Sequence, residues 1–154
     1  PSNENRPLGY EAPIYTSWAT VNRSDLIRVP AYKKGREASQ RIEYRAPDPS
    51  CNPYLAFSVM LAAGLEGIRS QYKLPKQSEN DVSLISEKER QELGIESLPK
   101  TLGEAIEEAE NSKIVKEALG DYIFSSFLEN KKIEWQKYNE QVTDYELRRY
   151  LSIL

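Results

Sequence analysis

The sequence predicts an α+β fold, with short antiparallel strands first and a layer of helices after them. Residues 14–46 contain three short runs rich in β-branched and aromatic side chains, separated by turn-forming residues. Residues 52–154 instead carry helix-capping patterns and apolar residues at helical spacing. The length of 154 residues, with 39% hydrophobic and 29% charged residues, fits one globular domain.

Composition excludes several functional classes. A formal net charge of −3 argues against a chain that binds nucleic acid as a whole. No apolar run approaches the roughly 20 residues of a membrane span. The single cysteine, Cys51, excludes an internal disulfide framework, and the chain has no histidine to act as a general base. We therefore expect a cytoplasmic protein that binds neither nucleic acid nor membrane.

The chain opens with a polar segment and a loop. Residues 1–8 do not begin with methionine, so we interpret them as the cut edge of a longer protein or a remnant of cloning. Residues 9–13 place the carboxylate of Glu11 beside Gly9, as in a flexible loop that covers a site.

Residues 14–21, 26–29 and 40–46 are the three predicted strands. They are joined closely, and a parallel crossover needs a dozen or more residues. The sequence therefore predicts antiparallel neighbours.

The third strand alternates charged and apolar side chains. Arg41, Glu43 and Arg45 share one face, whereas Ile42 and Tyr44 point to the other, which we expect to be a core. A face of cation, carboxylate and cation suits a ligand that is anionic and carries a metal. A solvated strand with ion pairs is the alternative.

Basic residues are concentrated around these strands. Residues 22–48 hold seven basic side chains against four acidic ones, and arginine presents a rigid fork of donors that matches phosphate and carboxylate. From spacing alone, a phosphate- or carboxylate-binding face and a set of surface ion pairs explain the pattern equally well. The basic residues are Arg23, Arg28, Lys33, Lys34, Arg36, Arg41 and Arg45.

The first predicted helix begins at Asn52-Pro53, with Asn as the cap and Pro at the first helical position. From Tyr54 to Ile68 it is apolar on nearly every side. Such a helix is normally buried, so we expect it to be the central core element.

After an irregular segment at 69–85, capping boxes predict three more helices: to about Leu93, over 102–111, and over 144–154. A long helical pattern at 112–138, interrupted near Gly120, lies between the last two. The boxes pair Ser86 with Glu89, Thr101 with Glu104 and Thr143 with Glu146.

The last helix carries an apolar stripe at helical spacing: Leu147, Tyr150, Leu151 and Leu154. So short a helix is marginal alone, so the stripe must pack on something. Its own domain and a neighbouring subunit are the two possible partners.

Several motifs, in this order and spacing, resemble the C-terminal part of a type I glutamine synthetase. The resemblance extends over nearly the whole chain and implies that residues 9–154 are a portion of that catalytic domain. It rests on Gly9-Tyr10-Glu11-Ala12-Pro13, Asn22-Arg23-Ser24, Ile27-Arg28-Val29-Pro30, Arg41-Ile42-Glu43-Tyr44-Arg45, Asn52-Pro53-Tyr54-Leu55 and Ala63-Gly64-Leu65-Glu66-Gly67.

The resemblance implies an enzyme that makes glutamine from glutamate, ATP and ammonia through γ-glutamyl phosphate, with Mg²⁺ or Mn²⁺. By the same resemblance, Glu43 is a metal ligand, Arg28 and Arg41 bind ATP, and Arg45 holds the glutamate substrate. Arg23 contacts ATP, the transferring phosphate and glutamate. Glu11 closes the site, contacts glutamate and helps to take a proton from ammonium.

The family also forms a dodecamer of two rings, in which a helix matching 144–154 docks into the opposite ring. This chain departs from the family pattern in two places. Asn5 stands where a glutamate-binding arginine is expected, with Arg6 one position away, and residues 81–84 lack the tyrosine that some members adenylylate.

The family's other metal ligands lie upstream of the matched segment, so we expect the chain alone to be inactive. Two other functions stay open. One is a ligase of the same superfamily that joins glutamate to another amine, such as a polyamine. The other is a truncated module without catalytic activity that only assembles with partners.

Overall fold

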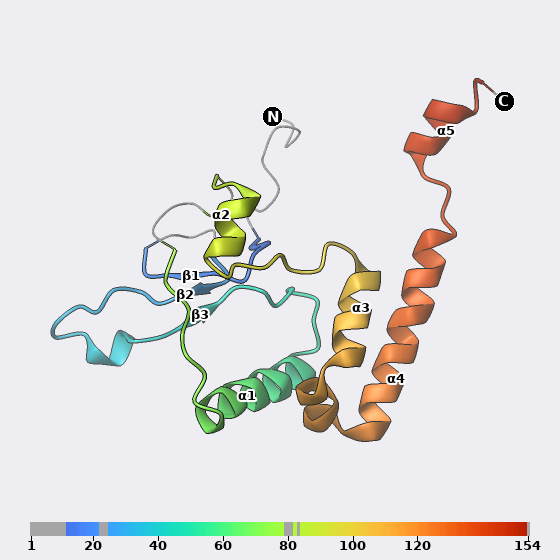
Figure 1. The fold of residues 1–154 in the computed structure, drawn as a ribbon. Helices are drawn as coiled ribbons and strands as arrows, with labels where there is room; N and C mark the ends of the chain where they lie inside the picture. Colours follow the sequence, from blue (N-terminus) through green and yellow to red (C-terminus); the bar gives the residue numbers. More distant parts are fainter. Residues whose placement is uncertain (1–11, 22–24, 79–81, 83, 154) are drawn as a thin grey trace. The chain divides into compact units, whose positions relative to one another are not determined.

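The structure, a computed structural model, describes residues 12–21, 25–78, 82 and 84–153 (Figure 1). It divides into two compact units, residues 1–100 and 101–154, which we describe one at a time. A small sheet and several helices confirm the α+β class.

The sheet consists of β1 (Trp18–Ala19), β2 (Ile27–Arg28) and β3 (Glu43–Tyr44), in that order. β2 and β3 are antiparallel, as predicted. β1 and β2 are parallel, so the prediction for that pair was wrong. The reason is strand length: strands of two residues need so short a return path that residues 20–26 suffice, whereas the rule assumes longer strands.

A segment from the irregular region covers the outer edge of β1. The Trp18 indole Nε1 donates to the Pro75 carbonyl at 2.8 Å, and the Ser78 amide donates to the Trp18 carbonyl at 3.0 Å. The Ser78 hydroxyl also donates to Asp25, whose side chain is fully buried. These contacts hold residues 75–78 against the sheet.

A second long-range pairing joins residues 14–16 to residues 96–98. Tyr15 and Ser97 form an antiparallel bridge, and the Leu98 amide donates to the Ile14 carbonyl at 2.9 Å. The Arg90 guanidinium, from α2 (Glu87–Glu92), stacks 4.6 Å from the centre of the Tyr15 ring. These contacts join the first strand region of this unit to the segment that follows α2.

Helix α1 (Pro53–Arg69) forms as predicted, because the Asn52 side chain accepts hydrogen bonds from the amides of Tyr54 and Leu55. The prediction that it is the buried core was wrong: none of its residues is buried. Within its own unit, no other described helix or strand packs onto it.

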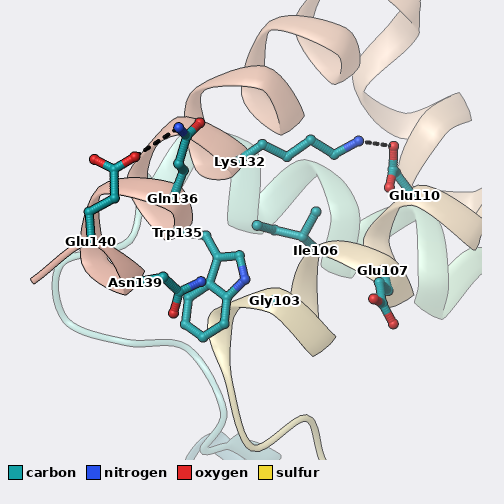
Figure 2. Close-up of a pocket in the computed structure, with 9 residues that line it drawn as sticks. All are labelled: Gly103, Ile106, Glu107, Glu110, Lys132, Trp135, Gln136, Asn139 and Glu140. Atoms are coloured by element: carbon teal, nitrogen blue, oxygen red, sulfur yellow. Dashed lines mark hydrogen bonds and ion pairs between the residues drawn. The ribbon is translucent and has the colours of Figure 1, made fainter.

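The second unit is a helical hairpin of α3 (Leu102–Asn111) and α4 (Lys113–Asn139). Its core contains Ile106, Leu119, Phe124 and Leu128. Gly120 has φ +72° and breaks the helical geometry of α4, as predicted from the glycine. At the open end of the hairpin Gly103 lies so close to Trp135 that a Cβ there would meet the indole nitrogen at 2.7 Å (Figure 2).

Helix α5 (Asp144–Tyr150) begins with the predicted capping box, in which Thr143 and Glu146 bond each other's backbone amides. It ends four residues before the predicted 154, and Leu154 lies outside the described residues. The described stripe residues Leu147, Tyr150 and Leu151 are exposed. No helix in the described part of the chain is long and apolar enough to cross a membrane.

Candidate functional site

The pairing of β2 with β3 brings two of the predicted site residues face to face. The register places Arg28 opposite Glu43, and the Arg28 Nη1 donates to the Glu43 Oε2 at 2.8 Å. Two residues before Glu43, Arg41 donates to the other oxygen, Oε1, from Nε at 3.0 Å and from Nη2 at 2.6 Å. One carboxylate is therefore held between two guanidinium groups, which we call the Arg–Glu–Arg cluster.

The cluster controls the ionisation of its carboxyl group. Hydrogen bonds from Arg28, and next from Arg41, lower the pKa of Glu43 below its usual value. Glu43 is thus a carboxylate at neutral pH. The cluster carries two positive charges against one negative charge, and the net charge of +1 suits an anionic ligand.

Arg45 lies just beyond β3, where its amide donates to the Leu26 carbonyl at 2.9 Å. Its Nη1 is buried without a hydrogen-bond partner, as is the Nε of Arg28. Buried donors normally have partners, so each of these nitrogen atoms is free to bond an acceptor that the described residues do not supply.

Two of the predicted site residues, Glu11 and Arg23, lie outside the described residues. The alternation of the third strand is partly confirmed: Arg41 and Glu43 do share a face. The expectation of a core on its other face was wrong, because Ile42 and Tyr44 are 69% and 45% exposed. Within its own unit, β3 packs only against β2 among the described helices and strands.

Sequence reasoning missed the cross-strand pairing of Arg28 with Glu43, since the register depends on contacts between distant residues. It also missed Asp25 and its partner Ser78. An aspartate in a polar turn is usually solvated, and nothing in the local pattern distinguishes one that is buried.

The described side chains do not form a complete metal site by themselves. Among the described residues, no three or more Asp, Glu, His or Cys side chains gather in a group that could hold a metal ion. The Glu43 oxygens are hard donors of the type that Mg²⁺ and Mn²⁺ prefer. Glu43 therefore fits as one ligand of such an ion, whose other ligands would come from elsewhere.

Neither of two hollows is lined by a residue of the Arg–Glu–Arg cluster. One, of about 870 Å³, lies between residues 13–15, α2 and residues 94–100. The other, of about 450 Å³, is lined by residues of the α3–α4 hairpin, Trp135 and Ile106 among them (Figure 2). Its acidic rim is partly neutralised, because Lys132 is paired with Glu110 (Figure 2).

Comparisons with known proteins point to one family. The model of the family described as "Glutamine synthetase, catalytic domain" matches residues 6–150. The chain is 53% identical over 146 residues to the glutamine synthetase of Methanosarcina mazei and 49% identical over 145 residues to that of Mycolicibacterium smegmatis. These alignments cover 95% and 94% of this chain but 32% of each relative. The chain thus spans about a third of the length of the curated relatives it matches.

A solved structure is similar to this chain in fold. The protein described as "Apo GmaS without ligand" matches with a TM-score of 0.73 and 30% identity. The match covers 92% of this chain and 30% of that one.

Proposed function

This chain belongs to the glutamine synthetase catalytic-domain family, and from that premise we propose that it supplies one wall of the active site of an ATP-dependent ligase. The proposed reaction joins ammonia to glutamate through γ-glutamyl phosphate. As ATP is the proposed substrate, we place the reaction in the cytoplasm.

The observation that carries this proposal is the Arg–Glu–Arg cluster. Phosphoryl transfer develops negative charge on the phosphate oxygens, and a site stabilises it with fixed cations. We assign Arg28 and Arg41 to the phosphates of ATP, because both are held on the strand pair by Glu43. Glu43 is the proposed metal ligand of this wall, and a bound Mg²⁺ or Mn²⁺ would neutralise phosphate charge.

Three further roles follow from family membership. We assign Arg45 to the glutamate substrate, which agrees with its buried donor that lacks a partner. Arg23 would contact ATP, the transferring phosphate and glutamate. Glu11 would close the site, contact glutamate and accept a proton from ammonium, and closure would protect the acyl phosphate from water.

A complete site needs more residues than this wall provides. Because Glu43 alone cannot hold and position two metal ions, we propose that the chain by itself is inactive. We also propose that the whole enzyme is a homo-oligomer, a dodecamer of two rings, and that α5 with the stripe of Leu147, Tyr150 and Leu151 docks between subunits. The exposure of that stripe supports this role.

The test uses a chimera of the Methanosarcina mazei enzyme in which this chain replaces the matched third. We expect phosphate release from ATP that depends on glutamate and ammonium, and a loss of at least about 100-fold in kcat with Glu43→Gln. Glu92→Gln, a change on exposed α2, is the matched control. Activity of Glu43→Gln equal to that of the control, or steady turnover by the chain alone, would contradict the proposal. Faster turnover with methylamine or a polyamine than with ammonium would indicate an amine ligase instead.

A further inference from the structure

Residues 14–16 form a short segment whose backbone is held by the chain that follows α2. The Thr16 amide donates to the Glu96 carbonyl at 2.8 Å, and the Glu96 amide donates to the Thr16 hydroxyl at 2.9 Å. Two residues earlier, the Ile14 carbonyl accepts from the Leu98 amide at 2.9 Å. These bonds fix the direction of the segment, because each one joins residues far apart in the sequence.

Arg90 adds a side-chain contact to this backbone pairing. Its guanidinium carbon lies 4.6 Å from the centre of the Tyr15 ring, a distance at which the ring face attracts a cation. The same side chain donates from Nη1 to the Ile85 carbonyl, and the Arg90 carbonyl accepts from the Ile95 amide at 2.9 Å. Because these bonds hold Arg90 in place, its stack also holds the Tyr15 ring. We call the stacked pair of Arg90 and Tyr15 the Arg–Tyr clamp.

The clamp lies beside segments that lead to two of the proposed substrate contacts. Tyr15, Arg90 and Ala46 line the same hollow of about 870 Å³. Ala46 directly follows Arg45, and Tyr15 lies four residues after Glu11 in the sequence. Because Tyr15 borders a hollow, the packing of the described side chains does not enclose its ring. The stack on Arg90 is therefore a main restraint on the position of this ring.

We propose that Arg90 is a positioning residue, which fixes through the Tyr15 ring the segment that leads to Glu11. The inference rests on the proposed function, which assigns Glu11 to the reaction with ammonia. A displacement of about 1 Å in a reacting group can slow a reaction about 100-fold, so a restraint on this segment affects the ammonia step. The ATP phosphates are assigned to Arg28 and Arg41, which lie outside the segment. Loss of the clamp should therefore affect ammonium and ATP unequally.

The experiment uses the chimera of the Methanosarcina mazei enzyme that carries this chain, and it measures glutamine and phosphate together. Arg90→Gln removes the cation, and Tyr15→Leu removes the ring but keeps an apolar side chain. Each should raise the KM for ammonium by about tenfold and leave the KM for ATP within about twofold. With Glu11 displaced, water competes with ammonia for the carbonyl of γ-glutamyl phosphate, which returns glutamate and releases phosphate. The phosphate released per glutamine should then rise from about one to about two.

Control variants separate a positioning role from a purely structural one. Tyr15→Phe keeps the ring and should retain both KM values, as should Lys88→Gln, which removes an exposed cation from the same helix. The double variant Arg90→Gln/Tyr15→Leu should be within about twofold of the worse single variant, since both changes break one contact. If Arg90→Gln loses helical circular dichroism, Tyr15→Leu decides, because it leaves the bond to Ile85 intact. An equal rise in both KM values, or a phosphate-to-glutamine ratio that stays at about one, would overturn the proposal.

Amide hydrogen exchange in the same chimera lets the two proposals fail separately. The Thr16 and Leu98 amides should exchange at least about tenfold faster in Arg90→Gln and Tyr15→Leu than in Lys88→Gln, because the segment is then held less firmly. This pattern in a chimera without ligase activity would contradict the proposed function and leave the clamp standing. An active chimera whose exchange and phosphate-to-glutamine ratio do not change in the variants would overturn the role of Arg90 and leave the proposed function standing.

Discussion

Hydrogen bonds from both Arg28 and Arg41 lower the pKa of Glu43, and the effect of each arginine can be measured. The hydrogen bond from Arg28 is the largest cause of the lowered pKa, and the bond from Arg41 is the next. We expect Arg28→Gln to raise the pKa of Glu43 more than Arg41→Gln does, as followed by NMR titration of the side-chain carboxyl. Arg36→Gln, outside the cluster, should not move it. Equal shifts in the two cluster variants would contradict the order.

The sign of the pH dependence follows from the same shift. Because the folded pKa of Glu43 is below its value in the unfolded chain, the cluster stabilises the fold above the unfolded pKa. That contribution is lost as the pH falls through the folded pKa. The wild-type chain should therefore lose stability toward acidic pH more steeply than Arg28→Gln.

Asp25 and Ser78 form the other contact that acts at the scale of single residues. Ser78→Ala would leave a buried carboxylate without its described partner, so we expect unfolding free energy to fall by about 1–3 kcal/mol. Urea titration followed by Trp18 fluorescence in a Trp135→Phe background measures it. Ser58→Ala, on exposed α1, should change stability by less than about 0.5 kcal/mol. A similar effect of both substitutions would show that the Asp25 contact has no special role.

At the scale of elements, local signals predicted the helices well. The caps at Asn52, Ser86, Thr101 and Thr143 act within three residues, so they can be read directly from the sequence. Strand pairing cannot be read in that way. The parallel pair of β1 and β2 depends on which distant backbone groups meet, as do the bonds from residues 75–78.

Helix α5 provides the prediction for this scale. Thr143→Ala removes the side-chain acceptor for the Glu146 amide, and a lost cap of this kind costs about 1 kcal/mol. We expect the ¹³Cα shifts of residues 144–150 to move toward random-coil values, while those of α3 stay unchanged. The bonds from Thr143 also lower the pKa of Glu146, so acidification below its usual value of 4.5 should loosen α5 in the same way. Unchanged shifts in the variant would show that packing, not capping, holds α5.

At the scale of the whole molecule, the sequence predicted the fold class and the family resemblance, but not the pairing of Arg28 with Glu43 and not what is buried. The apolar pattern of α1 correctly indicates a helix that is suited to burial. Whether such a helix is buried depends on which other segment packs against it. The sequence of the helix itself does not identify that segment. The same reason explains the exposure of Ile42 and Tyr44.

Uncovered apolar surface should also give the isolated chain a measurable property. We expect strong fluorescence of the dye ANS, which binds exposed apolar surface, at pH 7. The double variant Phe57→Gln/Leu61→Gln should reduce the signal by about half. Tyr122→Gln, which removes one exposed aromatic ring from α4, serves as the control. Equal signals from the double variant and the wild type would place the dye elsewhere.

The close contact between Gly103 and Trp135 has a mechanical consequence for the hairpin. The two helices are joined at Ser112. Gly103 lies at the opposite end of the hairpin, where it contacts the indole of Trp135. The methyl group of Gly103→Ala would force the two helices apart at this end of the hairpin. The substitution would push Trp135 away from α3 and disturb the stacking of its ring on Tyr138. The connection between α3 and α4 at Ser112 would not change.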